Sequence, residues 1–103
     1  MGRYTEVAEA LRHGKKAVLV HSNADVDAIG SAYALYRCFP DCTICACGGV
    51  DYVANVFAEK LKIPMTSEYD PSDYDLTVVV DTSSPELLCV TVPDNSLVID
   101  HHI

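Results

Sequence analysis

The sequence predicts an α/β fold, with a parallel, Rossmann-like sheet of about four to five strands and helices on both faces. Short continuous apolar runs such as Lys16–His21 and Leu76–Asp81 are typical of strands buried on both faces of a parallel sheet. Segments with apolar residues at helical spacing alternate with these runs. The chain has 103 residues and is 50% hydrophobic, which is enough for one domain with a core.

The elements alternate along the chain, and each strand is a continuous apolar run. They are expected to be a helix at Thr5–His13, a strand at Lys16–His21, a helix at Asp27–Phe39, a strand at Cys42–Cys47, a helix at Tyr52–Leu61, a short strand at Ile63–Thr66, a strand at Leu76–Asp81, a short helix or turn at Ser84–Leu88 and a strand at Leu97–Asp100. Gly48 and Gly49 form the turn after the second strand, and Glu68–Tyr74 is an acidic loop.

Capping residues bound the helices, and the two longer helices each have one apolar face. Thr5 is suited to the N-cap of the first helix and Gly14 to the position after its end. Pro40 ends the second helix, and Pro85 suits the first position of the short one. The residues expected to face the core are Ile29, Ala32, Tyr33 and Tyr36 in the second helix and Val53, Val56, Phe57 and Leu61 in the third.

Charge and hydropathy exclude some classes of function. The net charge is −8, from 15 acidic against 7 basic residues, which argues against broad binding to nucleic-acid backbones. A small anionic substrate stays compatible if divalent cations gather at the acidic groups. The longest apolar runs, about six residues, are far short of the roughly 20 that span a bilayer. With no apolar signal region at the N-terminus, we expect a cytoplasmic protein that does not bind membranes.

Four of the five cysteines lie close together in the sequence, at Cys38, Cys42, Cys45 and Cys47. We interpret Cys42–Cys47 as a buried strand that uses cysteine as a small apolar residue. Alternation along it places Cys45 and Cys47 on one face. A zinc or iron–sulfur site and a redox role are the alternatives.

Polar residues follow three of the predicted strands at their carboxyl ends. They are His21, Asn23, Asp25 and Asp27 after the first strand, Asp81 at the end of the fourth, and Asp100, His101 and His102 at the end of the last. Ligand sites of open α/β sheets lie at the carboxyl ends of the strands, so these side chains are expected to converge on one crevice.

Divalent-metal catalysis suits such a cluster. Crowded carboxylates repel one another unless cations neutralise them. Mixed imidazole and carboxylate ligands fit Mn, Fe, Co or Zn better than Ca. Two metals about 3.5–4 Å apart would share a bridging carboxylate and supply hydroxide for attack on phosphorus. The structural alternative is that Asp25 or Asp27 serves as a helix N-cap.

Three motifs resemble those of the DHH phosphoesterase family. His21–Ser31 is similar to the family's first motif, of the pattern HxNxDxDAxGS. Val78–Ser83 resembles the second motif, and Asp100-His101-His102 is the motif that names the family. The matches occur in the family's order and span most of the chain.

The resemblance implies two metal ions, usually Mn²⁺, with Mg²⁺, Co²⁺ or Fe²⁺ as alternatives. His21 and Asp25 would hold one ion, Asp27 and His101 would hold the second, and Asp81 would bridge the two.

The resemblance also implies three residues outside the ligand set. His102 would face the phosphate of the substrate, and Asp100 would orient the neighbouring histidine. Asn23 would position the loop or contact the side of the nucleophile.

The implied function is a metal-dependent phosphoesterase that cleaves phosphodiester or phosphoanhydride bonds of small nucleotides or short oligonucleotides. A manganese-dependent pyrophosphatase or exopolyphosphatase is an alternative, as is a metal-binding module without turnover. We expect residues 1–103 to be the N-terminal part of a DHH domain, inactive by itself, with the C-terminal substrate-binding domain and a further ligand Asp absent. A homodimer is one assembly that would cover the sheet edge exposed in such a piece.

Overall fold

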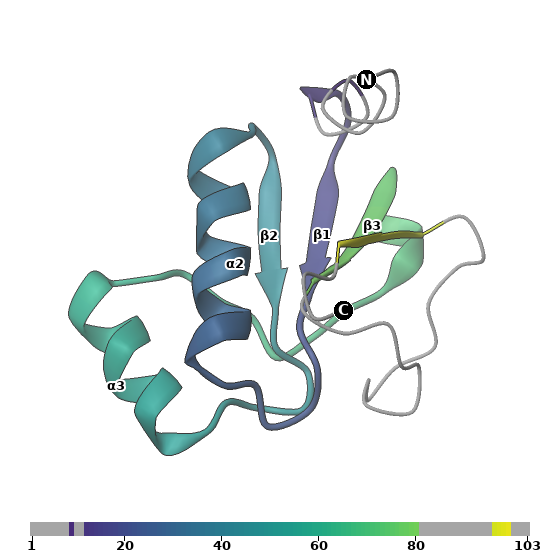
Figure 1. Cartoon of the computed structure of the whole chain (residues 1–103). Coiled ribbons are helices and arrows are strands. Elements are labelled where there is room, and N and C mark those ends of the chain that lie inside the picture. Colours follow the sequence, from purple (N-terminus) through teal and green to yellow (C-terminus); the bar gives the residue numbers. More distant parts are fainter. Residues whose placement is uncertain (1–8, 10–11, 81–95, 100–103) are drawn as a thin grey trace.

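The computed structural model describes residue 9, residues 12–80 and residues 96–99. Its elements are β1 (Lys16–Leu19), α2 (Val26–Cys38), β2 (Cys42–Cys45), α3 (Tyr52–Leu61), the 3-10 helix η1 (Pro71–Asp73), β3 (Leu76–Val80) and β4 (Leu97–Ile99). The fold is α/β, with the sheet and both α-helices of the described part visible in Figure 1. The predicted alternation of strands and helices is confirmed for this part.

All the strands described are parallel and lie in the order β2-β1-β3-β4. β1 is an interior strand, paired with β2 on one side and with β3 on the other. Its residues Lys16–Leu19 are all buried, as predicted for a strand covered on both faces. Because a parallel sheet needs a crossover between successive strands, α2 lies between β1 and β2 in the chain.

The two faces of the sheet belong to different apolar clusters. Val18, Ile44 and Val78 pack on the side of α2 and α3, together with Ala28, Ile29 and Ala32 of α2. Ala17, Leu19, Cys45 and Val79 form the other cluster, against which Cys47, Tyr69 and Tyr74 pack. The predicted alternation of β2 is confirmed, since Cys45 and Cys47 share one face and Ile44 and Ala46 lie on the other.

Both α-helices of the described part lie on one face of the sheet (Figure 1). On the opposite face the structure places Tyr69 and Tyr74, whose rings stack at 5.9 Å between centroids. Within residues 12–80 and 96–99, the predicted helices on both faces are thus shown for one face only. The helix predicted at Thr5–His13 lies largely outside the described residues, and the element at Ser84–Leu88 lies wholly outside them.

The predicted inward face of α3 is wrong in part. Val53 is 62% exposed and Leu61 is 46% exposed, whereas Ala54 and Ala58 are buried. The reason is that α3 packs beside α2, with fewer contacts to the sheet. Small residues allow two helices to approach closely, so the alanines and not the large apolar side chains face the neighbour. Phe57, also predicted inward, packs against the core.

The short strand predicted at Ile63–Thr66 is reduced to one bridge beside β2. Thr66 donates its N–H to the carbonyl of Ile44 at 2.9 Å and accepts from the N–H of Ala46 at 2.8 Å. Ile63 itself is buried in the core. The segment therefore covers only the carboxyl part of the β2 edge.

Candidate metal centre

The loop that follows β1 carries the first group of predicted ligands and leads directly into α2. Asp25 is the N-cap of α2, and its Oδ1 accepts a hydrogen bond from the N–H of Ala28 at 3.0 Å. Asp27 lies in the first turn of the helix and is exposed. Of the two capping residues that the sequence allowed, the structure selects Asp25, because an N-cap side chain reaches the N–H three residues on.

The His21 ring is oriented by a hydrogen bond to the backbone of the next residue, Ser22. Its Nδ1 lies 3.0 Å from the carbonyl oxygen of Ser22. A carbonyl only accepts, so the ring hydrogen is on Nδ1 in this contact. Nε2 then faces the Oδ1 of Asp25 at 3.9 Å. The His21 side chain is 17% exposed and that of Asp25 is 52% exposed.

The separation of this pair is compatible with two ligands of one divalent ion. When the His21 ring donates through Nδ1, Nε2 can present its lone pair toward the Asp25 carboxylate, an arrangement that a cation between them would stabilise. Ligand atoms bound at about 2.1 Å to one ion are at most about 4.2 Å apart. The observed 3.9 Å lies within that span. A metal-ligating histidine also commonly donates its other ring N–H to a backbone carbonyl, as His21 does to Ser22.

Asn23 occupies a strained point of the same loop, with φ of +53° in the left-handed region. Its N–H donates to the carbonyl of Gly48 at 3.2 Å, and the N–H of Ala24 donates to the carbonyl of Gly49 at 3.1 Å. Asn is among the residues that tolerate this conformation best. Asn23 therefore lies at the bend of this loop, and both roles considered for its side chain remain predictions.

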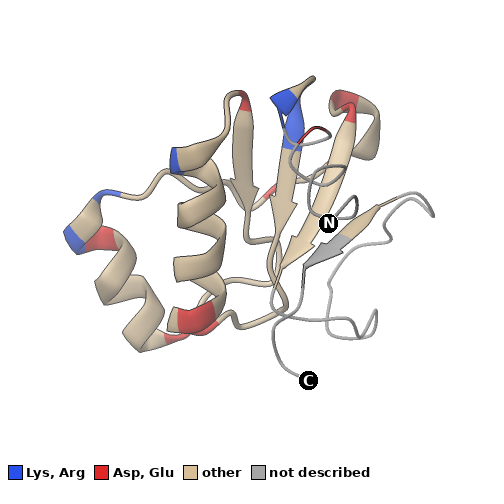
Figure 2. Ribbon diagram, turned by 45° about the horizontal axis from the view of Figure 1, so that its top comes forward, with Lys and Arg blue, Asp and Glu red and all other residues tan. Residues whose placement is uncertain are grey.

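Three acidic residues lie beside the carboxyl edge of the sheet, in the segments that follow β1 and β2. Asp25 caps α2 and Asp51 caps α3, and Asp27 follows in the first turn of α2. Arg37 and Lys60 lie in the last turns of these helices, so the positive charges of α2 and α3 are at the opposite ends (Figure 2). This polarity lowers the energy of both helix dipoles and creates a negative region beside His21.

The remaining predicted site residues, Asp81, Asp100, His101 and His102, lie outside the described residues. The strands that precede them are shown. β1, β3 and β4 are adjacent and parallel, and the last residues of β3 and β4, Val80 and Ile99, are paired. Among residues 12–80 and 96–99, no group of three or more His, Cys, Asp or Glu could hold a metal ion. The structure thus brings together His21 and Asp25 and leaves the rest of the ligand set as a prediction.

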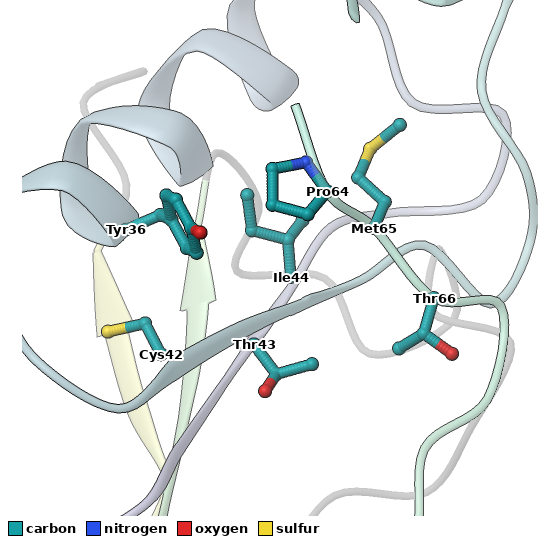
Figure 3. A pocket seen from close by; sticks show the side chains of 7 residues that line it. All are labelled: Tyr36, Cys42, Thr43, Ile44, Pro64, Met65 and Thr66. Atoms are coloured by element: carbon teal, nitrogen blue, oxygen red, sulfur yellow. The ribbon is translucent and has the colours of Figure 1, made fainter. Parts of the chain in front are cut away.

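A cavity of about 240 Å³ lies elsewhere, beside the edge of β2. Figure 3 shows the side chains that line it, which are Tyr36, Cys42, Thr43, Ile44, Pro64, Met65 and Thr66. None of the predicted ligands is among them. The cavity has no charged lining residue and is smaller than typical ligand pockets, so it does not compete with His21 and Asp25 as the site of phosphate chemistry.

Two residues of the neighbouring loop were missed by the sequence analysis. Gly48 was assigned only to a turn, yet it lies against Ser22. Asp51 was given no role, although it caps α3 and donates its N–H to Ala24. An Asp directly before a helical pattern is a capping signal and could have identified the second of these. The first depends on a contact between distant segments, for which the sequence carries no signal.

Residues 15–103 match the family model described as DHH family, N-terminal domain. An uncharacterized protein of Methanocaldococcus jannaschii is 34% identical over 104 residues, covering 91% of this chain and 22% of that protein. The chain thus spans about a fifth of the length of this relative. No solved structure matches this chain. Among the helices described, none has the length and apolar character needed to cross a membrane. Since the family model covers most of the sequence, the chain belongs to the DHH family.

Proposed function

We propose that this chain forms the metal-holding part of a phosphoesterase that depends on two divalent ions of the Mn²⁺ type. The bonds hydrolysed would be phosphodiester or phosphoanhydride bonds of small nucleotides or short oligonucleotides. DHH family members are generally phosphoesterases and typically metal-dependent, which supports the reaction class. The substrate and the identity of the metal are part of the proposal.

The observation that carries the proposal is the geometry of His21 and Asp25. The Ser22 carbonyl fixes the ring hydrogen on Nδ1, and Nε2 faces the carboxylate across 3.9 Å. Asp25 uses one lone pair of Oδ1 for the Ala28 N–H, and a carboxylate has about four such sites. The second oxygen and the remaining lone pairs are therefore free of this cap, so one residue can serve as both N-cap and ligand.

In the proposed centre, His21 and Asp25 would hold one ion, Asp27 and His101 would hold the other, and Asp81 would be a ligand of both. Bound metals would supply charge neutralisation at the phosphate and a lowered pKa for water. Asp100 would fix the orientation of the neighbouring histidine, and His102 would donate to a phosphate oxygen. The loop containing Asn23 would keep His21 and Asp25 in place before substrate arrives.

The overall charge favours a small substrate over a long polyanion. A net charge of −8 opposes binding along an extended nucleic-acid backbone. A mononucleotide, a dinucleotide or pyrophosphate would place its few charges on the metals, where the local field is positive. The expected partners are therefore small phosphorylated molecules or short oligonucleotides.

Manganese titration tests the metal site by way of Asp25. Asp25→Asn keeps an N-cap of equal quality but weakens a carboxylate ligand. We expect Mn²⁺ to raise the melting temperature of the parent chain and to raise that of the Asn variant much less. The control is Asp70→Asn, which removes the same charge from another capping residue, one that accepts from Ser72 N–H at 3.0 Å in η1. Equal Mn²⁺ stabilisation of all three proteins would refute the proposed site.

Activity is tested, with Mn²⁺ present, in a protein that contains this chain and has about the length of the Methanocaldococcus jannaschii relative. The panel contains a linear dinucleotide, a cyclic dinucleotide, adenosine bisphosphate and inorganic pyrophosphate. Turnover of a nucleotide substrate that is lost in Asp81→Asn supports the proposal. Turnover of pyrophosphate alone would contradict a nucleotide substrate and would favour the pyrophosphatase alternative. Metal binding without turnover of any compound would make the domain a metal-binding module and would contradict the proposed hydrolysis.

A further inference from the structure

The loop after β1 is fastened to the loop after β2 by its backbone. Asn23 and Ala24 donate to the carbonyls of Gly48 and Gly49 at 3.2 and 3.1 Å, and Asp51 donates back to the carbonyl of Ala24 at 2.8 Å. Ala24 and Val50 form a parallel bridge at the same place. The segment that leads into α3 is thus hydrogen-bonded alongside the loop that carries His21 and Asp25.

Gly48 is the point of closest approach between the two loops. A Cβ added to Gly48 would lie 2.5 Å from the Oγ of Ser22 and 2.6 Å from its Cα. The side-chain atom could rotate away, but the Cα belongs to the backbone. A side chain at position 48 therefore requires the backbones of Ser22 and residue 48 to move apart. The requirement at this position is space, in contrast to Gly49, whose φ of +80° requires a left-handed backbone.

The displaced residue is the one that orients His21. The carbonyl of Ser22 accepts the Nδ1–H of His21, and this bond leaves Nε2 as the ring atom that faces Asp25. Moving the Ser22 backbone would loosen that bond and change both the direction of the ring and the nitrogen that carries the hydrogen. The size of the residue at position 48 therefore affects the geometry of the candidate ligands.

We infer that Gly48 and the backbone N–H of Asp51 are positioning groups for the His21–Asp25 pair, so that the entry to α3 determines how tightly the first metal is held. This inference rests on the proposed function. The two groups touch neither the ion nor the substrate and act through Ser22 and Ala24. Loss of groups that orient metal ligands typically weakens affinity by about 10- to 100-fold.

The first experiment compares Gly48→Ala with Gly14→Ala in the full chain. Gly14 precedes β1 at the opposite end of the strand, has φ of +78° and would place a Cβ 2.9 Å from Asp75, so its replacement also introduces strain. Mn²⁺ affinity is measured on the folded proteins from the electron paramagnetic resonance signal of free Mn²⁺. We expect at least a tenfold weaker affinity in Gly48→Ala and a change below twofold in Gly14→Ala. Equal effects in both variants would overturn the inference.

A second pair keeps the test decisive if Gly48→Ala does not fold. Asp51→Ala removes the cap of α3 and keeps its N–H, whereas Asp51→Pro removes both, at a φ of −74° that proline adopts. Only the proline variant lacks the bond to Ala24, so we expect it to bind Mn²⁺ about tenfold more weakly than the alanine variant. Equal affinities of these two folded variants would overturn the inference.

Nitrogen NMR of the His21 ring separates the inference from the proposed function. The ¹⁵N shifts report which ring nitrogen carries the hydrogen, without any metal. We expect hydrogen on Nδ1 in the parent chain and a mixture in Gly48→Ala and Asp51→Pro. If the parent chain fails to bind Mn²⁺ while the tautomer still depends on these positions, the metal proposal falls and the positioning role stands. An unchanged tautomer in both variants would refute the positioning role.

Discussion

Asp25 illustrates how one side chain can stabilise the fold and also be placed for chemistry. Its Oδ1 accepts the Ala28 N–H, and the same oxygen lies 3.9 Å from the Nε2 of His21. The sequence left Asp25 and Asp27 equal as capping residues. The structure assigns the cap to the residue three positions before the donor, which frees Asp27 in the first turn to remain exposed.

Cys45 is a buried thiol in the cluster on the face opposite α2. It is 0% exposed, and its Sγ lies 3.9 Å from the hydroxyl of Tyr74. Burial raises the pKa of the Cys45 thiol, and burial also raises the pKa of Tyr74. A small apolar role for this cysteine agrees with its packing against Ala17, Leu19 and Val79.

The raised pKa of Cys45 predicts a loss of stability at alkaline pH. A group whose pKa is raised by folding adds stability below its unfolded pKa, about 8.5 for a thiol, and that stability disappears as the pH rises through the folded value. Urea unfolding should therefore show a lower midpoint at pH 10 than at pH 7.5. Cys45→Ala should flatten this difference. Parallel pH profiles of the two proteins would show that the buried thiol makes no contribution.

At the scale of elements, α3 departs most from the sequence-based expectation. The apolar pattern predicted that Val53, Val56, Phe57 and Leu61 face inward. Phe57 does pack against the core, but the main neighbour of α3 is α2 and not the sheet. Ala54 and Ala58 fill that contact, and Tyr52, Val53 and Leu61 are exposed. Periodicity alone does not separate an interface made by small residues from an adjacent stripe of large ones.

Two adjacent positions test this assignment of α3. Val53→Lys should change the free energy of unfolding by less than about 0.5 kcal/mol, as surface substitutions usually do. Ala54→Leu should cost about 1–3 kcal/mol, because it overpacks a buried contact. Urea denaturation of both variants measures these values. A larger loss for Val53→Lys than for Ala54→Leu would show that the outer face of α3 is covered.

At the scale of the molecule, charge imbalance is the dominant electrostatic feature. The chain carries 15 acidic and 7 basic residues, and acidic groups cap both α-helices at the carboxyl edge of the sheet. Self-repulsion of this kind weakens the folded state and is screened by salt. Cations that bind at this edge would relieve the part of the repulsion that arises from the acids located there.

Salt is therefore expected to stabilise the metal-free chain. Raising NaCl from 10 mM to 500 mM in the presence of a chelator should increase the melting temperature by several degrees, equivalent to about 1 kcal/mol in a domain of this size. The increase should be smaller when Mn²⁺ is bound, because the ions have already neutralised the acidic edge. Differential scanning calorimetry gives both values. A melting temperature independent of salt in the metal-free chain would show that the acids do not repel.

The sequence by itself determined the α/β class, the positions of the longer elements and the chemical types of the candidate ligands. Continuous apolar runs set β1 and β3, helical spacing set α2, and the order of motifs identified the family. These features are local, because the patterns that indicate a buried strand, a helix or a cap each involve only a few neighbouring residues. His21 and Asp25 belong to this class, since they lie four residues apart on one loop.

Only the tertiary structure decided how distant segments meet. It placed α3 beside α2, reduced the strand predicted at Ile63–Thr66 to a single bridge, and brought Gly48 against Ser22. Such contacts depend on the distance and direction between backbones and not on local periodicity, so a turn glycine and a packing glycine are identical in sequence. The candidate ligands could therefore be predicted from the sequence, whereas the backbone contacts between the loop of His21 and Asp25 and the segment before α3 could not.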